Sequence, residues 1–246
     1  MFRSLLIFLQ FQSIILSQDL DSAFIIANEN FNKKNFIESS KNYELILSNG
    51  YHSVDLYLNM GNSYFYLEEF GHSRWSFEKG LQLSPFDKDL NYNYEQLIKS
   101  VTNAIEPPKN NFLDMFNIFL QSFSLNIFIL SAVSVFFIFS LLTLLDRIFK
   151  NKAIQKLSYI FLSILVLNIL LVFTKKVWNE NNSYAIVVED ETAIYSAPYL
   201  NDSIQMSVLY NGNKVKVDQK TNLWLEITTF DGRKGWIRAK DIRNLD

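Results

Sequence analysis

The residues that could carry catalysis are few and do not form a recognised catalytic set. The chain has 246 residues, two histidines and no cysteine, so thiolate nucleophiles, thiolate zinc sites and disulfides are excluded. His52 and His72 lack the spacing of an HExxH motif or of another metal-ligand pattern. The acidic runs Glu68-Glu69 and 189–191 fall at expected helix ends or turns, where solvated carboxylates are routine. We therefore predict a protein that is not an enzyme and that uses no cofactor or metal.

Two other groups of residues have the types expected at ligand-binding surfaces. One group follows helical spacing and combines amides with apolar side chains: Phe24, Asn28, Phe31, Asp55, Leu58, Asn62, Phe65 and Tyr66. Its amides could hydrogen-bond a bound peptide, although asparagine also occurs at such positions without a ligand. The second group is aromatic: Tyr195, Tyr199, Trp224 and Trp236. Its two tryptophans could bind a ligand, or they could be core residues of alternating strands.

Composition limits the classes of partner. The net charge is −2, which argues against nucleic acid because nucleic-acid-binding proteins usually present a basic face. The length leaves room for two small domains and a membrane segment, but not for a large enzyme core as well. Polar segments flank a strongly apolar block, so we expect a multidomain membrane protein.

Residues 19–104 predict an all-α helical-repeat domain. A pattern of large and small residues recurs after 34 positions. The second copy comprises Tyr57, Met60, Gly61, Tyr64, Phe70, Ser73, Phe77, Gly80 and Pro85, and the first comprises Ala23, Ile26, Ala27, Asn30, Phe36, Ser39, Tyr43, Ile46 and Tyr51. Small residues let antiparallel helices approach closely, aromatics fill the gaps, and proline ends a helix. The pattern resembles two tetratricopeptide repeats (TPRs) with a capping helix over residues 87–102, although Asn30 and Tyr51 depart from it.

In TPR proteins the first helix of each pair lines the binding face. Repeats that clamp a carboxylate pair the groove asparagine with a basic residue one turn earlier. Phe24 and Leu58 occupy those places in this chain, so the resemblance implies an apolar or mixed groove.

Residues 1–17 have the features of a secretory signal peptide. Arg3 and the amino terminus are positive, two short apolar runs follow, and Ser17 is a small residue at the candidate cleavage site. An uncleaved amphipathic helix is the alternative, because Gln10 and Gln12 interrupt the apolar run.

The apolar block predicts a transmembrane hairpin. Residues 105–123 form a linker that could include an interfacial helix or the leading turn of the next span. Two uncharged stretches, within 124–145 and 157–174, are long enough to cross a bilayer. Residues 146–156 between them carry four basic residues, which favours a cytoplasmic loop. We therefore expect an inner (cytoplasmic) membrane protein with both termini extracytoplasmic. For the amides of Asn126 and Asn168 we expect a helix-end or interhelical hydrogen bond.

Residues 180–246 change to the period of β-strands and predict a small all-β barrel. Alternating segments surround Trp224 and Trp236, and Asp231-Gly232 marks a hairpin turn. This segment resembles a bacterial-type SH3 domain, whose relatives often bind cell-wall peptides.

The order of these parts resembles the BatE-like family of the bacterial aerotolerance (Bat) operon, which combines TPRs, two spans and an SH3 domain. The resemblance implies an envelope scaffold whose partners are von Willebrand A-type membrane proteins and a MoxR-type ATPase, with a role in stress tolerance. A sensor or binder of peptidoglycan and a subunit of a cryptic enzyme are the alternatives, because fold likeness does not determine function.

Overall fold

The computed structural model describes residues 22–101, 103–106, 115–116, 119–120, 122–199 and 203–245. The predicted signal peptide and most of the predicted interfacial helix lie outside these residues. The chain divides into two compact units: residues 109–183 form one, and the segments before and after them together form the other. Each unit is described by itself.

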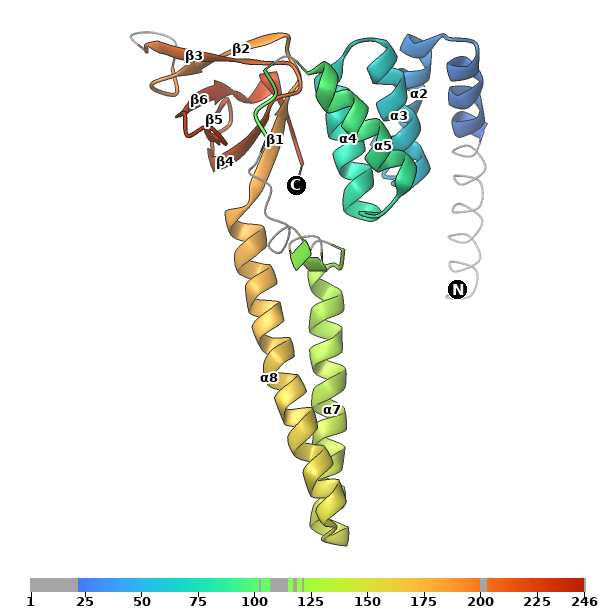
Figure 1. Ribbon diagram of the computed structural model, residues 1–246, viewed down its shortest axis with the longest axis vertical. Helices are drawn as coiled ribbons and strands as arrows, with labels where there is room; N and C mark the ends of the chain where they lie inside the picture. The colour runs from blue at the N-terminus through green and yellow to red at the C-terminus, as the bar shows by residue number, and fades with distance from the viewer. Residues whose placement is uncertain are drawn as a thin grey trace, which may run out of the picture. The chain divides into compact units, whose positions relative to one another are not determined.

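The N-terminal part of the larger unit is helical (Figure 1). A helix over residues 22–32 precedes α2 (Phe36–Ser48), α3 (Val54–Tyr66), α4 (Phe70–Leu83) and α5 (Lys88–Ser100). Side-chain caps start two of these helices: Ser53 accepts a hydrogen bond from the Leu56 amide, and Asp87 accepts from the Leu90 amide. We refer to these helices as the helical domain.

The helical domain repeats its own packing after 34 residues. The Ser39 hydroxyl donates to the Ala27 carbonyl at 3.0 Å, and the Ser73 hydroxyl donates to the Gly61 carbonyl at 2.8 Å. The turn residues Lys34 and Glu68 share the left-handed conformation, with φ of 61° and 62°. A side-chain hydrogen bond and a backbone turn conformation therefore both recur after 34 residues, once in each helix pair.

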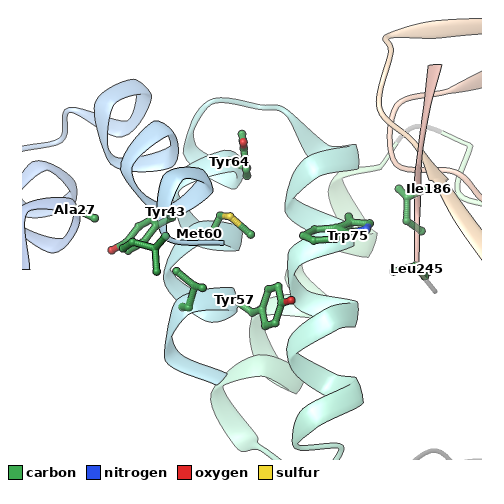
Figure 2. Packing of buried hydrophobic residues seen from close by; sticks show 10 residues of the cluster. Ala27, Tyr43, Tyr57, Met60, Tyr64, Trp75, Ile186 and Leu245 are labelled. Atoms are coloured by element: carbon green, nitrogen blue, oxygen red, sulfur yellow. The ribbon is translucent and has the colours of Figure 1, made fainter. Parts of the chain in front are cut away.

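Buried side chains explain the spacing of small and large residues. A Cβ atom added at Gly61 would lie 2.5 Å from the Phe77 ring, and one at Gly80 would lie 2.9 Å from Leu90. Ala27, Tyr43 and Met60 belong to one buried cluster (Figure 2), which also includes Leu56. Close helix contact thus requires the small residues that the sequence places there.

Seven strands form the C-terminal β-domain as one sheet in the order β3-β2-β6-β5-β4-β1-β7. Their bounds are β1 Ser183–Val187, β2 Glu191–Tyr195, β3 Gln205–Tyr210, β4 Lys214–Lys220, β5 Trp224–Thr229, β6 Lys234–Arg238 and β7 Ile242–Asn244. On β2, β5 and β6 buried residues alternate with half-buried or exposed ones. One face of these strands therefore packs on the core around Ile194, Ile227 and Ile237, and the other faces outward.

The smaller unit contains a helical hairpin of α7 (Leu125–Phe149) and α8 (Lys152–Asn181). Both helices are long and apolar enough to cross a membrane, and only 6% of the most apolar window of each is buried. The Ser131 hydroxyl donates to the Asn168 side-chain oxygen at 2.5 Å, so the predicted interhelical amide bond is present. The two helices extend into the predicted loop 146–156, so that only Lys150 and Asn151 lie between them. The Asn151 side chain caps the start of α8 by accepting a hydrogen bond from the Ala153 amide.

The β-domain packs against the helical domain within the larger unit. Trp75 on α4 points toward Ile186 on β1 and Leu245 after β7, and the three belong to one buried cluster (Figure 2). The Trp75 indole N–H donates to the Asn244 carbonyl at 2.6 Å. Gly71 allows the closest approach, because a Cβ atom there would lie 2.2 Å from the Val187 carbonyl oxygen.

Candidate functional site

The first predicted surface lies on the helix 22–32 and on α3, which are the first helices of the two pairs. Asp55 and Tyr66 are exposed, and the other six candidates are half-buried. Phe24 packs against Tyr43, while Phe31 and Tyr66 join Phe36 in an aromatic cluster with ring centroids 4.6 to 5.8 Å apart. We call the eight candidates, with α5 beside them, the first-helix face. None of the eight makes a hydrogen bond, an ion pair or a ring contact with the described residues of the β-domain.

The asparagines of the first-helix face bond each other, an arrangement that sequence reasoning missed. Asn59 donates to the side-chain oxygen of Asn28 at 3.1 Å, and Asn93 donates to that of Asn62 at 2.8 Å. The second bond repeats the first after 34 residues. The recurrence of both asparagines at that spacing was the feature of the sequence from which the bonds could have been predicted. Tyr43 adds a second donor to the Asn28 oxygen at 2.5 Å. The side-chain oxygens of Asn28 and Asn62 therefore link each helix to its neighbour, and the side-chain N–H groups of the same two residues have no partner among the described residues.

The second predicted surface lies on the outward face of β2, β5 and β6. Tyr195, Trp224 and Trp236 are half-buried on this face rather than in the core. Tyr195 is opposite Trp236 in the strand register, and its ring meets that of Trp224 edge-on at 5.4 Å. Trp224 is opposite Arg238. The sheet thus presents an aromatic surface with a guanidinium at one end.

A pocket of about 500 Å³ lies at that end of the sheet. Its lining residues come from three segments: Tyr199, Asn222, Leu223, Trp224, Arg238, Ala239 and Lys240. Two of the predicted aromatic candidates, Tyr199 and Trp224, line it. Tyr195 supports Trp224 from the side, and Trp236 lies on the sheet outside the lining. Sequence reasoning missed Arg238 and Lys240, although Arg238 alternates with Trp236 and must therefore share its face.

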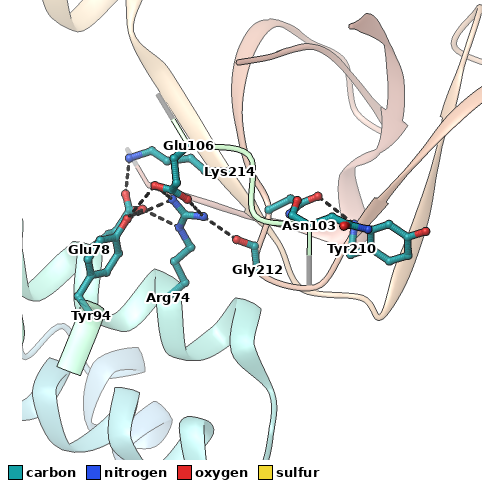
Figure 3. Close-up of polar contacts among 9 residues, drawn as sticks. Arg74, Glu78, Tyr94, Asn103, Glu106, Tyr210, Gly212 and Lys214 are labelled. Carbon is teal, nitrogen blue, oxygen red and sulfur yellow. Dashed lines mark hydrogen bonds and ion pairs between the residues drawn. The ribbon is translucent and has the colours of Figure 1, made fainter. Parts of the chain in front are cut away.

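A buried ionic network holds the β-domain against the helical domain (Figure 3). Arg74 on α4 is fully buried. Its Nε donates to Glu78 at 2.9 Å, Nη1 donates to the Gly212 carbonyl at 2.8 Å, and Nη2 donates to Glu106 at 3.0 Å. Tyr94 also accepts from Nη2, at 3.1 Å. Glu106 falls in the predicted linker 105–123, but its carboxylate belongs to this interface, where it and Glu78 are the acidic partners of the buried guanidinium among the described residues.

The charges of this network stabilise one another. Burial alone would raise the pKa of Glu78, but Lys214 and Arg74 together hold that pKa below its usual value. Burial alone would lower the pKa of Arg74, but Glu78, Tyr94 and Glu106 outweigh burial and raise it. Both groups are therefore ionised in the folded protein. Arg74 and Glu78 pair within α4, and Lys214 of β4 adds the ion pair that reaches Glu78 from the β-domain.

A second cluster joins the domains around Arg243 of β7. Its guanidinium makes two hydrogen bonds to Glu44 on α2, at 2.5 and 2.9 Å, and stacks 3.5 Å from the centre of the Trp75 ring. His72 lies 3.3 Å from Arg243 and stacks on Tyr64. Burial, and then the charge of Arg243, lower the pKa of His72. His72, which the sequence places at a helix start, is thus part of the interface.

The contacts with the β-domain come from α2 and α4, the second helices of the pairs, and from the residues that follow α5. Besides Arg74 and Arg243, Lys79 and Gln82 donate to the Leu245 carbonyl, and the Gly71 amide donates to Asn211. Asn213 donates to the Asn103 carbonyl. The β-domain therefore covers the face opposite to the one that carries the ligand candidates.

Comparison with known families bears on the β-domain. Residues 190–243 match the profile of the family described as "Bacterial SH3 domain". This match covers β2 to β7 and includes the pocket and three of the aromatic residues of the sheet face. No curated protein matches the chain.

Proposed function

We propose that this chain is a non-enzymatic, membrane-anchored scaffold that binds partner proteins of an envelope complex. One observation carries the proposal. The SH3 domain docks on the second helices through Arg74, Trp75 and Arg243, so the first-helix face and the pocket of the SH3 domain stay free for partners on one body. A protein that orients two binding surfaces in this way can hold two partners in a set geometry.

The helical domain supplies the first surface. Its 34-residue period in hydrogen bonds, turn conformations and asparagine pairs supports assignment as two TPRs with α5 as the cap. TPR arrays bind extended or helical peptides along the first helices. On the first-helix face, Asp55 and Tyr66 are exposed, and we assign them to direct contact with a partner.

The membrane hairpin supplies the anchor. Arg147, Lys150, Lys152 and Lys156 lie at or between the facing ends of α7 and α8, which supports placing that end in the cytoplasm. Both folded domains then lie outside the inner membrane. The BatE-like order of parts further supports von Willebrand A-type proteins and a MoxR-type ATPase as members of the complex, and a role in aerotolerance.

Co-purification from gently solubilised native membranes tests the scaffold. Wild type is compared with an Asp55→Lys, Tyr66→Ser variant of the first-helix face and with a Lys41→Glu control at an exposed position of α2, outside that face. Membrane partners should co-purify with wild type and with the control, and should be lost from the variant. If no membrane protein accompanies any of the three, the scaffold proposal is rejected.

Binding to peptidoglycan is the second candidate function, and the exposed aromatic pocket is the observation that favours it. Tyr199 and Trp224 could stack on a cell-wall fragment. Sedimentation of the purified full-length protein with cell-wall sacculi tests this function. Loss of co-sedimentation in a Tyr199→Ser variant, with the Asp55→Lys, Tyr66→Ser variant unaffected, would favour the cell wall over a protein partner.

A further inference from the structure

The pocket of the SH3 domain has apolar walls that are open to solvent. Leu223 is 73% exposed and Tyr199 is 54% exposed, while the Trp224 ring packs against the Tyr195 ring in a T-shaped contact. Large apolar side chains that remain exposed around a concave site are a feature of binding surfaces. A volume of about 500 Å³ accommodates one or two amino-acid side chains of a ligand.

The charged residues of the pocket are both basic. Among the residues that the structure describes, Arg238 and Lys240 line it and no acidic residue does. The Arg238 Nε donates to Asp241 at 3.0 Å, and Asp241, only 1% exposed, also accepts from Thr192. This buried carboxylate orients the guanidinium. The two Nη groups of Arg238 and the Lys240 ammonium have no hydrogen-bond or ion-pair partner among the described residues.

A neighbouring lysine shows that these cations differ from ordinary surface charges. Lys234 lies on the same strand and the same face as Arg238, but its ammonium pairs with Glu226 at 3.4 Å and with Asp218 at 3.7 Å. Lys234 thus has two acidic partners outside the pocket, whereas Arg238 pairs with Asp241 through Nε alone. Its two Nη groups and the Lys240 ammonium are the donors that the described residues leave for a ligand.

Apolar walls beside two cations require a ligand that carries an apolar group and an anion close together. The last residue of a polypeptide meets this requirement, because one residue bears both a side chain and a free carboxylate. An internal Asp or Glu carries its charge without an adjoining apolar group on the same residue. A saccharide would need several neutral hydrogen-bonding groups, whereas Asn222 is the one neutral amide of the lining and the Leu223 carbonyl already accepts from the Ala239 amide.

We propose that this pocket binds the C-terminal end of a partner protein, with the last apolar side chain against Tyr199, Leu223 and Trp224 and the terminal carboxylate on Arg238 and Lys240. The planar guanidinium, held at Nε by Asp241, presents its Nη groups to the two carboxylate oxygens. This inference rests on the proposed scaffold function and names the chemistry of one of its partners.

Binding of a labelled peptide to the full-length protein in detergent micelles tests the proposal. The probe is a fluorescein-labelled Gly-Ser-Gly-Ser-Phe-Leu peptide with a free carboxylate, and its matched control is the same peptide with a C-terminal amide. By fluorescence anisotropy the acid should bind about tenfold more tightly than the amide, as expected for loss of a charge-assisted hydrogen bond. Equal affinity of acid and amide, or no binding of either, overturns the proposal.

Three variants localise the effect. Lys240→Gln should reduce the preference for the acid, and Arg238→Gln should remove it. Because Arg238→Gln also leaves the buried Asp241 without its cation, Lys240→Gln carries the test if the Arg238 variant does not fold. Lys234→Gln is the matched control and should bind like wild type; if it reduces binding as much as Lys240→Gln, the charge of the pocket is not the cause and the proposal fails.

The outcome is separable from that of the scaffold. If membrane partners co-purify with the protein but the acid and amide peptides bind equally, only the carboxylate assignment is wrong. If the acid peptide binds and no membrane partner co-purifies, the pocket retains its ligand class and the scaffold is rejected.

Discussion

Arg74 shows what a single buried charge contributes to this molecule. It donates to groups from α4, from the segment after α5 and from the SH3 domain. An uncompensated buried carboxylate is far more costly than an exposed one. The residue therefore makes the stability of the helical domain depend on the presence of the SH3 domain.

We expect Arg74→Met to lower the free energy of unfolding by about 3–5 kcal/mol, because Glu106 loses its cation and Glu78 keeps only Lys214 of its two cationic partners. The matched control is Lys41→Met, which removes an ion pair with Glu38 whose side chains are 65% and 50% exposed. That change should cost at most about 1 kcal/mol. Urea unfolding followed by circular dichroism measures both, and equal losses would contradict the assignment.

His72 gives the interface a dependence on pH. Its pKa is lowered in the folded protein by burial and by Arg243, so the unfolded chain binds a proton more readily. The contribution of His72 to the free energy of unfolding is then fully present above the pKa of an unfolded histidine, about 6.5. This contribution is lost as the pH decreases from about 6.5 toward the lower pKa of His72 in the folded protein. We expect the urea midpoint to fall between pH 7 and pH 5.5, and a His72→Gln variant to show a smaller fall over the same range. An unchanged slope in the variant would assign the dependence to other groups.

At the scale of elements, the contact of α4 with β1 depends on one glycine. The Gly71 amide donates to Asn211 at 2.5 Å, and an added Cβ would lie 2.2 Å from the Val187 carbonyl oxygen. Backbone atoms cannot rotate away as the end of a flexible side chain can, so a larger residue must separate the two elements.

Gly71→Ala should lower the free energy of unfolding by about 1–3 kcal/mol through overpacking. It should also increase the rate of limited proteolysis in the segment after α5, because the docked SH3 domain holds that segment through the hydrogen bond from Asn213 to the Asn103 carbonyl. Ser76→Ala on the same helix is the control, since its hydroxyl bonds only within α4 to the His72 carbonyl. Identical proteolysis of both variants would show that Gly71 does not control the docking.

At the scale of the whole molecule, the absence of cysteine allows a direct test of topology. We expect single cysteines placed by Glu95→Cys in α5 and Gln219→Cys in β4 to react with a membrane-impermeant maleimide in intact spheroplasts. A Lys152→Cys variant, at the start of α8, should react only after permeabilisation, because basic residues at short connections stay in the cytoplasm. The reverse pattern would invert the proposed orientation, and labelling of all three in intact cells would argue against a membrane-spanning hairpin.

The sequence by itself determined the parts whose residues obey a local period. The 34-residue alternation of small and large residues indicated paired helices, the two long uncharged stretches indicated α7 and α8, and the period-two segments around Trp224 and Trp236 indicated the C-terminal sheet. These features depend on neighbours a few positions away, so a single chain reveals them. The helix ends were less predictable. Asn151 caps the start of α8, so the helix begins at Lys152, within residues 146–156 that composition alone marks as a loop.

Only the tertiary structure decided which surfaces remain available for a ligand. Arg74 pairs with Glu106 and Gly212, and Arg243 pairs with Glu44, over long separations in the sequence. Asn28 and Asn59 likewise meet only when neighbouring first helices pack. The ion pairs Arg74–Glu106 and Arg243–Glu44 follow no sequence period, because tertiary packing rather than the neighbouring sequence decides which residues pair. For the same reason Arg238 and Lys240 became visible as a ligand site only after the strands and the turn before β5 had closed a pocket around them.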